Sequence, residues 1–212
     1  MKKGYFVTFE GGEGTGKSTQ CRLLSDYLTK TGKKPILTRE PGGSVGAEEI
    51  RNLLVTGDEN RWDSVTETLL FMAARRNHLV QKIWPALEAD QVVICDRFLD
   101  STLAYQGYGY GKDQKTLDMI RTIYRLIAGD FYPDLTIILD IDPQEGLRRS
   151  YARAGNTEQR FESKDLSFHH NLRQGFLDLA RSGDRYVIVD ASATIEQIHN
   201  QICQIVQERL FS

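Results

Sequence analysis

The stretch that decides the fold reads YFVTFE at residues 5–10 and continues as GGEGTGKST at residues 11–19. It contains the complete phosphate-binding pattern G-x-x-x-x-G-K-[ST], with an apolar, β-rich run before it and a helix-like segment after it. The glycines let consecutive backbone N–H groups turn toward one point, at the positive end of a helix dipole. A glycine-rich turn with an incidental lysine is the alternative, and the flanking patterns weigh against it. The stretch therefore predicts a strand, a phosphate-binding loop at 11–18 and a helix.

This loop offers both a cation and a hydroxyl group to a nucleotide. Lys17 is expected to reach the β- and γ-phosphates as a mobile point charge, and the Ser18 hydroxyl to ligate the Mg²⁺ that bridges them. The residues expected around the nucleotide phosphates are Gly11, Gly12, Glu13, Gly14, Thr15, Gly16, Lys17, Ser18 and Thr19.

Composition predicts one globular domain over residues 1–212. The net charge of -2 gives no reason to expect nucleic-acid binding over a broad surface, because that mode needs clustered Lys and Arg. The three cysteines have no C-x-x-C spacing, which favours a reducing compartment. No stretch approaches the roughly 20 apolar residues of a membrane span. We expect a cytoplasmic protein that binds neither membrane nor nucleic acid.

Hydrophobic periodicity and turn residues predict alternating strands and helices along the chain. Strands are expected at 5–10, 35–38, 91–96, 135–140 and 186–190. Helices are expected at 19–31, 45–54, 64–87, 117–128, from 143 onward, 165–180 and 194–210. This order predicts an open α/β sheet of five parallel strands with helices on both faces, and ligands bound outside the carboxyl ends of the strands. The wide apolar coverage of the 64–87 helix suggests burial both by the sheet and by a second subunit.

A phosphate-binding loop alone fits ATPases, GTPases, kinases and carriers, so the other strand-end loops must decide. Three motifs do so in combination: TREPGG at 38–43, LFMAAR at 70–75, and Asp96-Arg97 with STLAYQG at 101–107. Together they resemble thymidylate kinase over essentially the whole chain. The resemblance implies a P-loop nucleoside monophosphate kinase-like fold with a mobile lid at about 146–162. It also implies a homodimer that transfers the γ-phosphoryl group of ATP to dTMP, with Mg²⁺, giving dTDP and ADP for dTTP synthesis.

Basic residues at the strand ends are candidates for the acceptor phosphate. Arg97, after the strand-end Asp96, is placed to hold a monophosphate bidentately, and Arg39 is a second such fork. A solvated strand-end arginine is the alternative for Arg97. Asp96 is expected to order water around Mg²⁺ or to pair with a basic group, so Ser18 and Asp96 are the predicted metal site.

The resemblance assigns Phe71 to stack on thymine and Arg75 to donate to its exocyclic carbonyl. At i and i+4 of a helix, the two side chains share one face. Without the resemblance, Phe71 fits a core position better. Thr102 and Gln106 would address the edge of the base, and Tyr105 would occupy the place of a ribose 2′-hydroxyl or, alternatively, be a buried aromatic. The predicted substrate-binding residues are Glu13, Arg39, Phe71, Arg75, Arg97, Ser101, Thr102, Tyr105 and Gln106.

Glu13 is unusual, because a bound anion would repel a carboxylate inside a phosphate cradle. It must point elsewhere, and the resemblance assigns it to the 3′-hydroxyl of the acceptor. Some relatives carry an arginine after this acid, where this chain has Gly14. The loop then offers only Lys17 as a cation.

The polar segment 148–165 is expected to supply the missing charge from its arginines when the lid closes. Arg149 and Arg153 are favoured, Arg160 is a further candidate, and Arg148 is expected to be solvated. The predicted catalytic residues are Lys17, Arg97, Arg149 and Arg153.

Two other functions fit part of the pattern. One is another nucleoside monophosphate or deoxynucleoside kinase, which the acceptor pocket would distinguish. The other is a nucleotide-dependent switch, against which the missing N-K-x-D motif and the arginine-bearing segment both weigh. The four histidines show no metal-ligand spacing and are expected to be ordinary core or surface residues.

Overall fold

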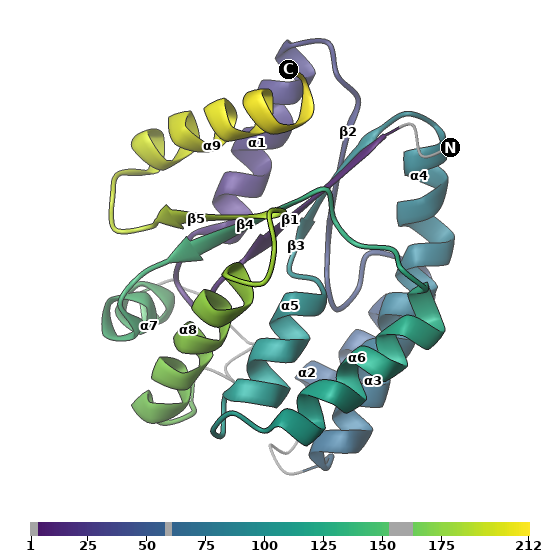
Figure 1. Cartoon of the computed structure of the whole chain (residues 1–212), viewed down its shortest axis with the longest axis vertical. Coiled ribbons are helices and arrows are strands. Elements are labelled where there is room, and N and C mark those ends of the chain that lie inside the picture. Colours follow the sequence, from purple (N-terminus) through teal and green to yellow (C-terminus); the bar gives the residue numbers. More distant parts are fainter. Residues whose placement is uncertain (1–3, 58–60, 153–162) are drawn as a thin grey trace.

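The computed structural model describes residues 4–57, 61–152 and 163–212. A sheet of five strands runs through it in the order β2-β3-β1-β4-β5, and every neighbouring pair is parallel (Figure 1). The strands are β1 Tyr5–Glu10, β2 Pro35–Arg39, β3 Val92–Asp96, β4 Leu135–Asp140 and β5 Tyr186–Asp190. The central strand is β1, whose Val7 pairs with Ile94 on one side and Leu135 on the other. The predicted parallel α/β sheet is confirmed.

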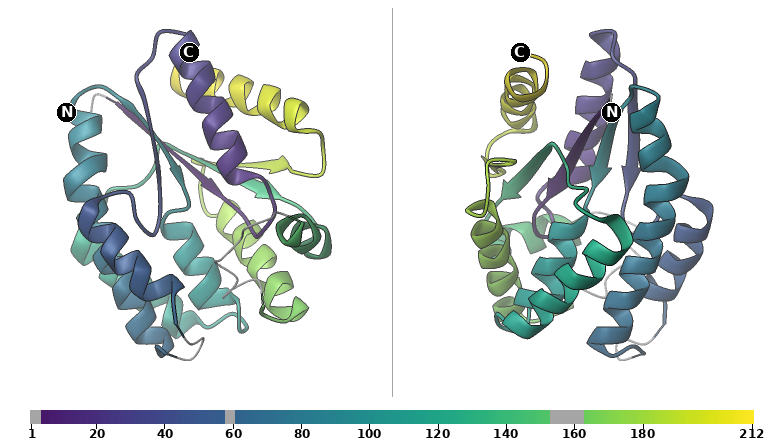
Figure 2. Two further views of the ribbon diagram at one scale, coloured as in Figure 1. Left: turned by 180° about the vertical axis from the view of Figure 1, so that it is seen from behind. Right: turned by 45° about the vertical axis from the view of Figure 1, so that its right-hand side comes forward.

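Helices cover both faces of this sheet, as Figures 1 and 2 show from three directions. One face carries α1 and α9, and the other carries α3 to α6 and α8. The α-helices are α1 Lys17–Lys30, α2 Val45–Val55, α3 Ser64–His78, α4 Trp84–Glu88, α5 Leu99–Thr102, α6 Gln114–Ala128, α7 Pro143–Tyr151, α8 Leu166–Ala180 and α9 Ile195–Leu210, with π-helical turns η1 Leu79–Ile83 and η2 Leu103–Tyr108. None of the described helices is long and apolar enough to cross a bilayer.

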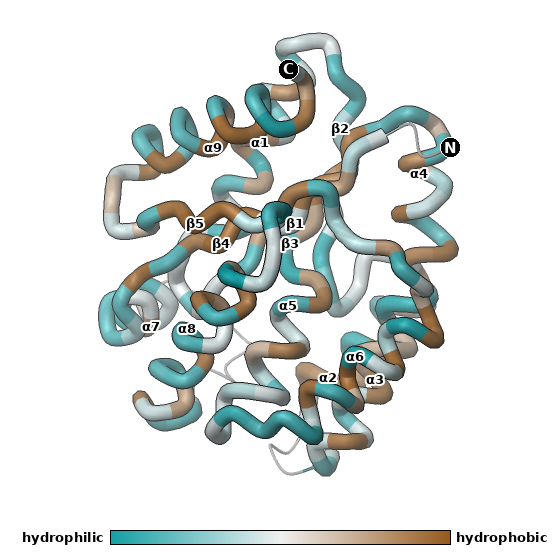
Figure 3. The backbone as a smooth tube through the Cα atoms, viewed as in Figure 1, coloured by the Kyte–Doolittle hydropathy of each residue, from teal (hydrophilic) through white to brown (hydrophobic). Residues whose placement is uncertain are grey.

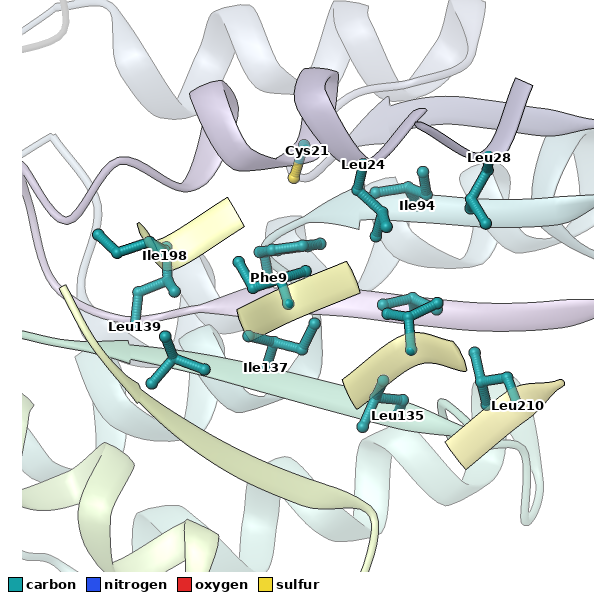
Figure 4. Packing of buried hydrophobic residues seen from close by; sticks show 14 of the residues in the cluster. Phe9, Cys21, Leu24, Leu28, Ile94, Leu135, Ile137, Leu139, Ile198 and Leu210 are labelled. Atoms are coloured by element: carbon teal, nitrogen blue, oxygen red, sulfur yellow. The ribbon is translucent and has the colours of Figure 1, made fainter. Parts of the chain in front are cut away.

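The three central strands, β1, β3 and β4, supply side chains to both layers, because successive residues of a strand point to opposite faces. In β1, Val7 and Phe9 belong to the same buried cluster as Leu24 of α1, and Figure 4 shows Phe9 beside Leu24. Phe6 instead packs against Phe98 on the opposite face of the sheet. Sheets buried on both sides need nearly continuous apolar strands. The strands are accordingly among the most hydrophobic parts of the backbone in Figure 3.

The predicted 64–87 helix is not one regular α-helix. It ends as α3 at His78, continues through the π-helical turn η1, and resumes as α4 at Trp84. Pro85 lies in the first turn of α4. Because proline has no N–H and its ring clashes with the carbonyl four residues earlier, a widened turn ahead of it accommodates the ring.

Residues 97–108, to which the sequence assigned no element, are mostly helical. They form α5 and then η2, which buries Leu103, Ala104 and Tyr105. Glycine and tyrosine have modest helix propensity, and tertiary packing overrides it here. The consequence is functional, because side chains one turn apart in 101–106 are brought onto a shared face beside the phosphate-binding loop.

Candidate active site

The loop between β1 and α1 is built on left-handed backbone at Gly11, Gly14 and Gly16, with φ of 132°, 67° and 89°. The Lys17 ammonium donates to the carbonyls of Gly11 at 3.0 Å and Gly12 at 2.6 Å. Burial and the charge of Arg97 lower the pKa of Lys17 to about 8. The lysine lies inside the loop, where it would follow a bound phosphate.

Helix α7 packs directly on this loop. A Cβ at Gly14 would lie 1.8 Å from the carbonyl oxygen of Gly146, so only glycine allows this approach. One turn further along α7, Arg149 donates to the carbonyl of Ala191 at 2.8 Å, while Glu145 accepts from Arg149 Nε at 2.7 Å. Arg148 also pairs with Glu145, but its side chain is 71% exposed. Arg149 is therefore the arginine of α7 that is held at the residue following β5.

The carboxyl end of β3 meets the loop at two places. The Ser18 hydroxyl donates to Asp96 Oδ2 at 2.5 Å, which brings two oxygen donors together at the start of α1. The next residue, Arg97, has a left-handed backbone with φ of 69°, which is uncommon for a residue other than glycine. This turn directs the chain back toward the loop.

Glu13, Arg97 and Tyr105 form a cluster on one side of the loop. Arg97 Nη2 and the Tyr105 hydroxyl donate to the same Glu13 oxygen, at 3.0 Å and 2.5 Å, and the guanidinium lies over the Tyr105 ring at 5.0 Å. Burial alone would raise the pKa of Glu13, but Arg97, Lys17 and the Tyr105 hydrogen bond outweigh it and lower the pKa to about 2. The carboxylate is thus ionised and directed away from the loop centre.

A second acid, Glu10, ties the end of β1 to the same segment. One of its oxygens accepts the Phe98 N–H at 2.8 Å, and the other accepts the Ser101 hydroxyl at 2.5 Å. The Ser101 oxygen in turn accepts from Arg97 Nη1 at 3.2 Å. Burial, helped by the nearby Asp100, raises the pKa of Glu10 to about 7. Glu10 thereby holds Arg97 in place through the backbone and through Ser101.

On the other side of the site, Arg75 lies 2% exposed in an ion pair with Glu40, at 2.7 Å. Its Nη2 also donates to the Thr102 hydroxyl at 3.0 Å. The second Glu40 oxygen contacts His78 Nδ1 at 3.0 Å, and His78 Nε2 contacts the Thr38 hydroxyl at 2.7 Å. This buried network fixes α3 against the end of β2.

Comparison with known proteins points to one family. A family model described as thymidylate kinase matches residues 9–202. A thymidylate kinase of Caulobacter vibrioides is 49% identical over 99% of both chains, and one of Bacillus cereus is 44% identical over 98% of this chain and 99% of its own. The crystal structure of thymidylate kinase from Ehrlichia chaffeensis is 37% identical, covers 96% of this chain and 98% of that one, and superposes with a TM-score of 0.76.

The chain belongs to the thymidylate kinase family. Both the resemblance drawn from the three motifs and the P-loop nucleoside monophosphate kinase-like fold are confirmed. The structure brings several predicted thymidylate kinase site residues into direct contact: Glu13, Arg97, Ser101 and Tyr105 in one group, and Arg75 and Thr102 in another.

Other predicted residues lie apart from these groups. Arg39 pairs with Glu48 at 3.2 Å, and its side chain is 56% exposed. Phe71 is half-buried on α3, one turn before Arg75. The residues Arg153 and Arg160 lie outside the described part of the chain, so their roles stay predictions.

Sequence reasoning missed Glu10, Glu40 and His78. Glu10 had a signal, since an acid at the end of an apolar strand and directly before the phosphate-binding loop is a costly residue to bury without a purpose. His78 was expected to be an ordinary core or surface histidine. It is fully buried, but it forms part of the network that anchors Arg75.

Glu10 generates a prediction for stability against pH. Its folded pKa of about 7 lies above the ordinary 4.5, so its protonation stabilises the fold below pH 4.5 and this contribution is lost as the pH rises through 7. A glutamine side chain at this position would not titrate. Relative to Glu10→Gln, the unfolding free energy of the wild type should fall by about 3 kcal/mol between pH 4.5 and pH 8.

Urea denaturation at a series of pH values measures this difference. Glu49→Gln, on the exposed side of α2, is the matched control and should show a constant offset from the wild type. A constant offset for Glu10→Gln as well would contradict the raised pKa.

Proposed function

We propose that this chain transfers the γ-phosphoryl group of ATP to dTMP, giving dTDP and ADP. The observation that carries the proposal is the contact between Glu13 and Arg97. Glu13 belongs to the loop of the phosphate donor, and Arg97 belongs to the segment that also contains Ser101, Thr102 and Tyr105. A donor phosphate over the loop and an acceptor phosphate on Arg97 would therefore meet.

Phosphoryl transfer needs alignment and neutralised charge more than covalent chemistry. Arg97 would bind the acceptor phosphate bidentately through its planar guanidinium, and Lys17 would remain in contact with the phosphoryl group that is transferred. Glu13, ionised and already accepting two hydrogen bonds, would orient the sugar of the acceptor through its 3′-hydroxyl. Tyr105 lies against Glu13 and would exclude a ribose 2′-hydroxyl at the same place.

Ser18, at the start of α1, and Asp96, at the end of β3, fit a magnesium ion. The Ser18 hydroxyl and the Asp96 carboxylate are hard oxygen ligands, and Ser18 Oγ lies 2.5 Å from Asp96 Oδ2 beside the loop. Within the described residues, no group of three His, Cys, Asp or Glu side chains forms a metal site. Mg²⁺ commonly takes one or two protein oxygens and completes its shell with phosphate oxygens and water. When bound, it would neutralise charge on the β- and γ-phosphates.

A homodimer forms part of the proposal. An apolar stripe on the outer side of α3 and η1 is solvent-exposed, with Val65, Leu69 and Val80 at 45%, 50% and 38%. Their spacing follows one helix face, as a helix covered by a second copy would require. Light scattering tests this, because a monomer would give 24.1 kDa and a dimer twice that. The cytoplasmic location stays a prediction from the cysteine pattern.

The activity itself is tested by acceptor dependence. We expect ADP release from ATP and Mg²⁺ to require dTMP, and to be far slower with dCMP, AMP or thymidine. A coupled assay for ADP, with each acceptor added singly, measures it. ATP hydrolysis at one rate whatever the acceptor would contradict a kinase and favour the switch.

Glu13→Gln separates the donor and acceptor sides of the loop. The carboxylate contacts Arg97 and Tyr105 rather than the loop centre, so its loss should raise the KM for dTMP by about tenfold or more, with little change in the KM for ATP. Steady-state kinetics in both substrates provides the measurement, and Glu49→Gln is the control. An equal loss of ATP affinity would place the carboxylate with the metal or the loop fold.

The arginines beyond the loop are tested by Arg153→Ala. A cation that stabilises only the transition state should lower kcat by about 10³-fold or more and leave dTMP binding nearly intact. Arg148→Ala is the control, because Arg148 is exposed and pairs only with Glu145 among the described residues. Arg149→Ala completes the series, since that side chain is held at Ala191. An unchanged kcat for Arg153→Ala would refute the role of Arg153.

A further inference from the structure

Two hydrogen bonds join α3 to the segment formed by α5 and η2. Arg75 Nη2 donates to the Thr102 hydroxyl at 3.0 Å, and Gln106 Nε2 donates to Glu67 Oε2 at 2.9 Å. Positions 67, 71 and 75 are successive members of an i, i+4, i+8 series, so they share one face of α3. Phe71 therefore lies between the two cross-connections, on the face that the base of the acceptor is proposed to contact.

The partner of Gln106 determines which way its amide points. Gln106 Nε2 donates to a carboxylate oxygen of Glu67, so the NH₂ group faces Glu67, and Oε1, on the other arm of the amide, points away from it. Glu67 is 8% exposed, so little water can compete with Gln106 for hydrogen bonds to its carboxylate. Among the described residues, Gln106 Oε1 is buried and has no hydrogen-bond partner. A buried acceptor left without a donor is costly, and a ligand N–H is one way to satisfy it.

We propose that Glu67 is a positioning residue for nucleobase selection, because it fixes the Gln106 amide so that Oε1 presents an acceptor to a ring N–H of the acceptor base. This inference rests on the proposed function. It adds Glu67 to the side chains that would select thymine, a 4-oxopyrimidine with a protonated N3. Glu67 would act through Gln106 and would not touch the base.

The polarity of the pair excludes the wrong base. Arg75 offers only donors and Gln106 Oε1 offers only an acceptor, which matches an exocyclic carbonyl beside an N3–H. Thymine and uracil both have this edge. Cytosine has the reverse, with an exocyclic amino group and an unprotonated N3, so it would set a donor against a donor and an acceptor against an acceptor. A site built to hydrogen-bond one pattern rejects its opposite strongly.

Glu67→Gln tests the inference, because the new amide can accept or donate and so no longer fixes Gln106. We expect the kcat/KM ratio of dTMP to dCMP to fall by about tenfold or more. The change should lie in the KM of the acceptors, with kcat and the KM for ATP within about twofold. The ratio of dTMP to dUMP should stay constant, since both bases carry N3–H. Glu88→Gln, an exposed change of the same kind on α4, is the control.

A second variant guards against a simple folding defect. In Glu67→Gln/Gln106→Glu, the amide at 67 would donate to the carboxylate at 106, whose other oxygen again offers only an acceptor. The ratio of dTMP to dCMP should return toward that of the wild type, and thermal unfolding should match it. Failure of the double variant to restore the ratio, despite normal unfolding, would overturn the inference.

The other outcomes are equally decisive. An unchanged ratio of dTMP to dCMP in Glu67→Gln, or an equal loss for dTMP, dUMP, dCMP and ATP, would show a purely structural role and overturn the inference while leaving the kinase intact. Absence of dTMP-dependent ADP release in the wild type would instead overturn the proposed function, and the inference with it.

Discussion

The register between β1 and β3 is the constraint on which the site depends. Phe9 pairs with Asp96, and the Arg97 N–H donates to the Phe9 carbonyl at 2.9 Å. In this register, the segments that follow the two parallel strands begin side by side. One is the phosphate-binding loop, and the other is the turn at Arg97. A slip by one residue would send every side chain of the strand to the opposite face. The contacts of Ser18 with Asp96 and of Glu13 with Arg97 follow from this register.

Charge balance at the strand ends explains how so many ionisable groups share a small buried volume. Removing one partner of a buried pair leaves an uncompensated charge, which is far more costly than an exposed ion pair is stabilising. Lys17 and Arg97 face Glu13, while Glu10 shares its site with Asp100 and has its pKa raised to about 7. The acids hold the cations at the place where phosphate charge would enter. The phosphates would then meet cations that are already oriented, with little reorganisation left to make.

Local patterns in the sequence predicted the strands, most helices and the phosphate-binding loop, because each depends on neighbours within a few residues. The interruption at η1 and the helical form of 97–108 were missed, since Pro85 acts on the preceding turn and the packing of Tyr105 overrides propensity. Contacts between residues that are far apart in the sequence could not be predicted either. Glu10 meets Ser101 and Glu67 meets Gln106 only after the sheet and α3 have assembled. Family resemblance supplied Arg75, but its anchoring by Glu40 needed the fold.

The proposed donor side and the proposed base side of the site are built by different physical means, and this difference suits the tasks proposed for them. The donor side relies on close backbone approach, where Gly14 and Gly146 let α7 rest on the loop with few side chains between them. Backbone groups suit phosphate, which is the same in every nucleotide. The proposed base side relies on polar side chains that contact one another, Arg75 with Glu40 and Thr102, and Gln106 with Glu67. Burying such polar groups lowers stability, but it holds each donor and acceptor in one orientation. A site that discriminates among bases requires this fixed orientation.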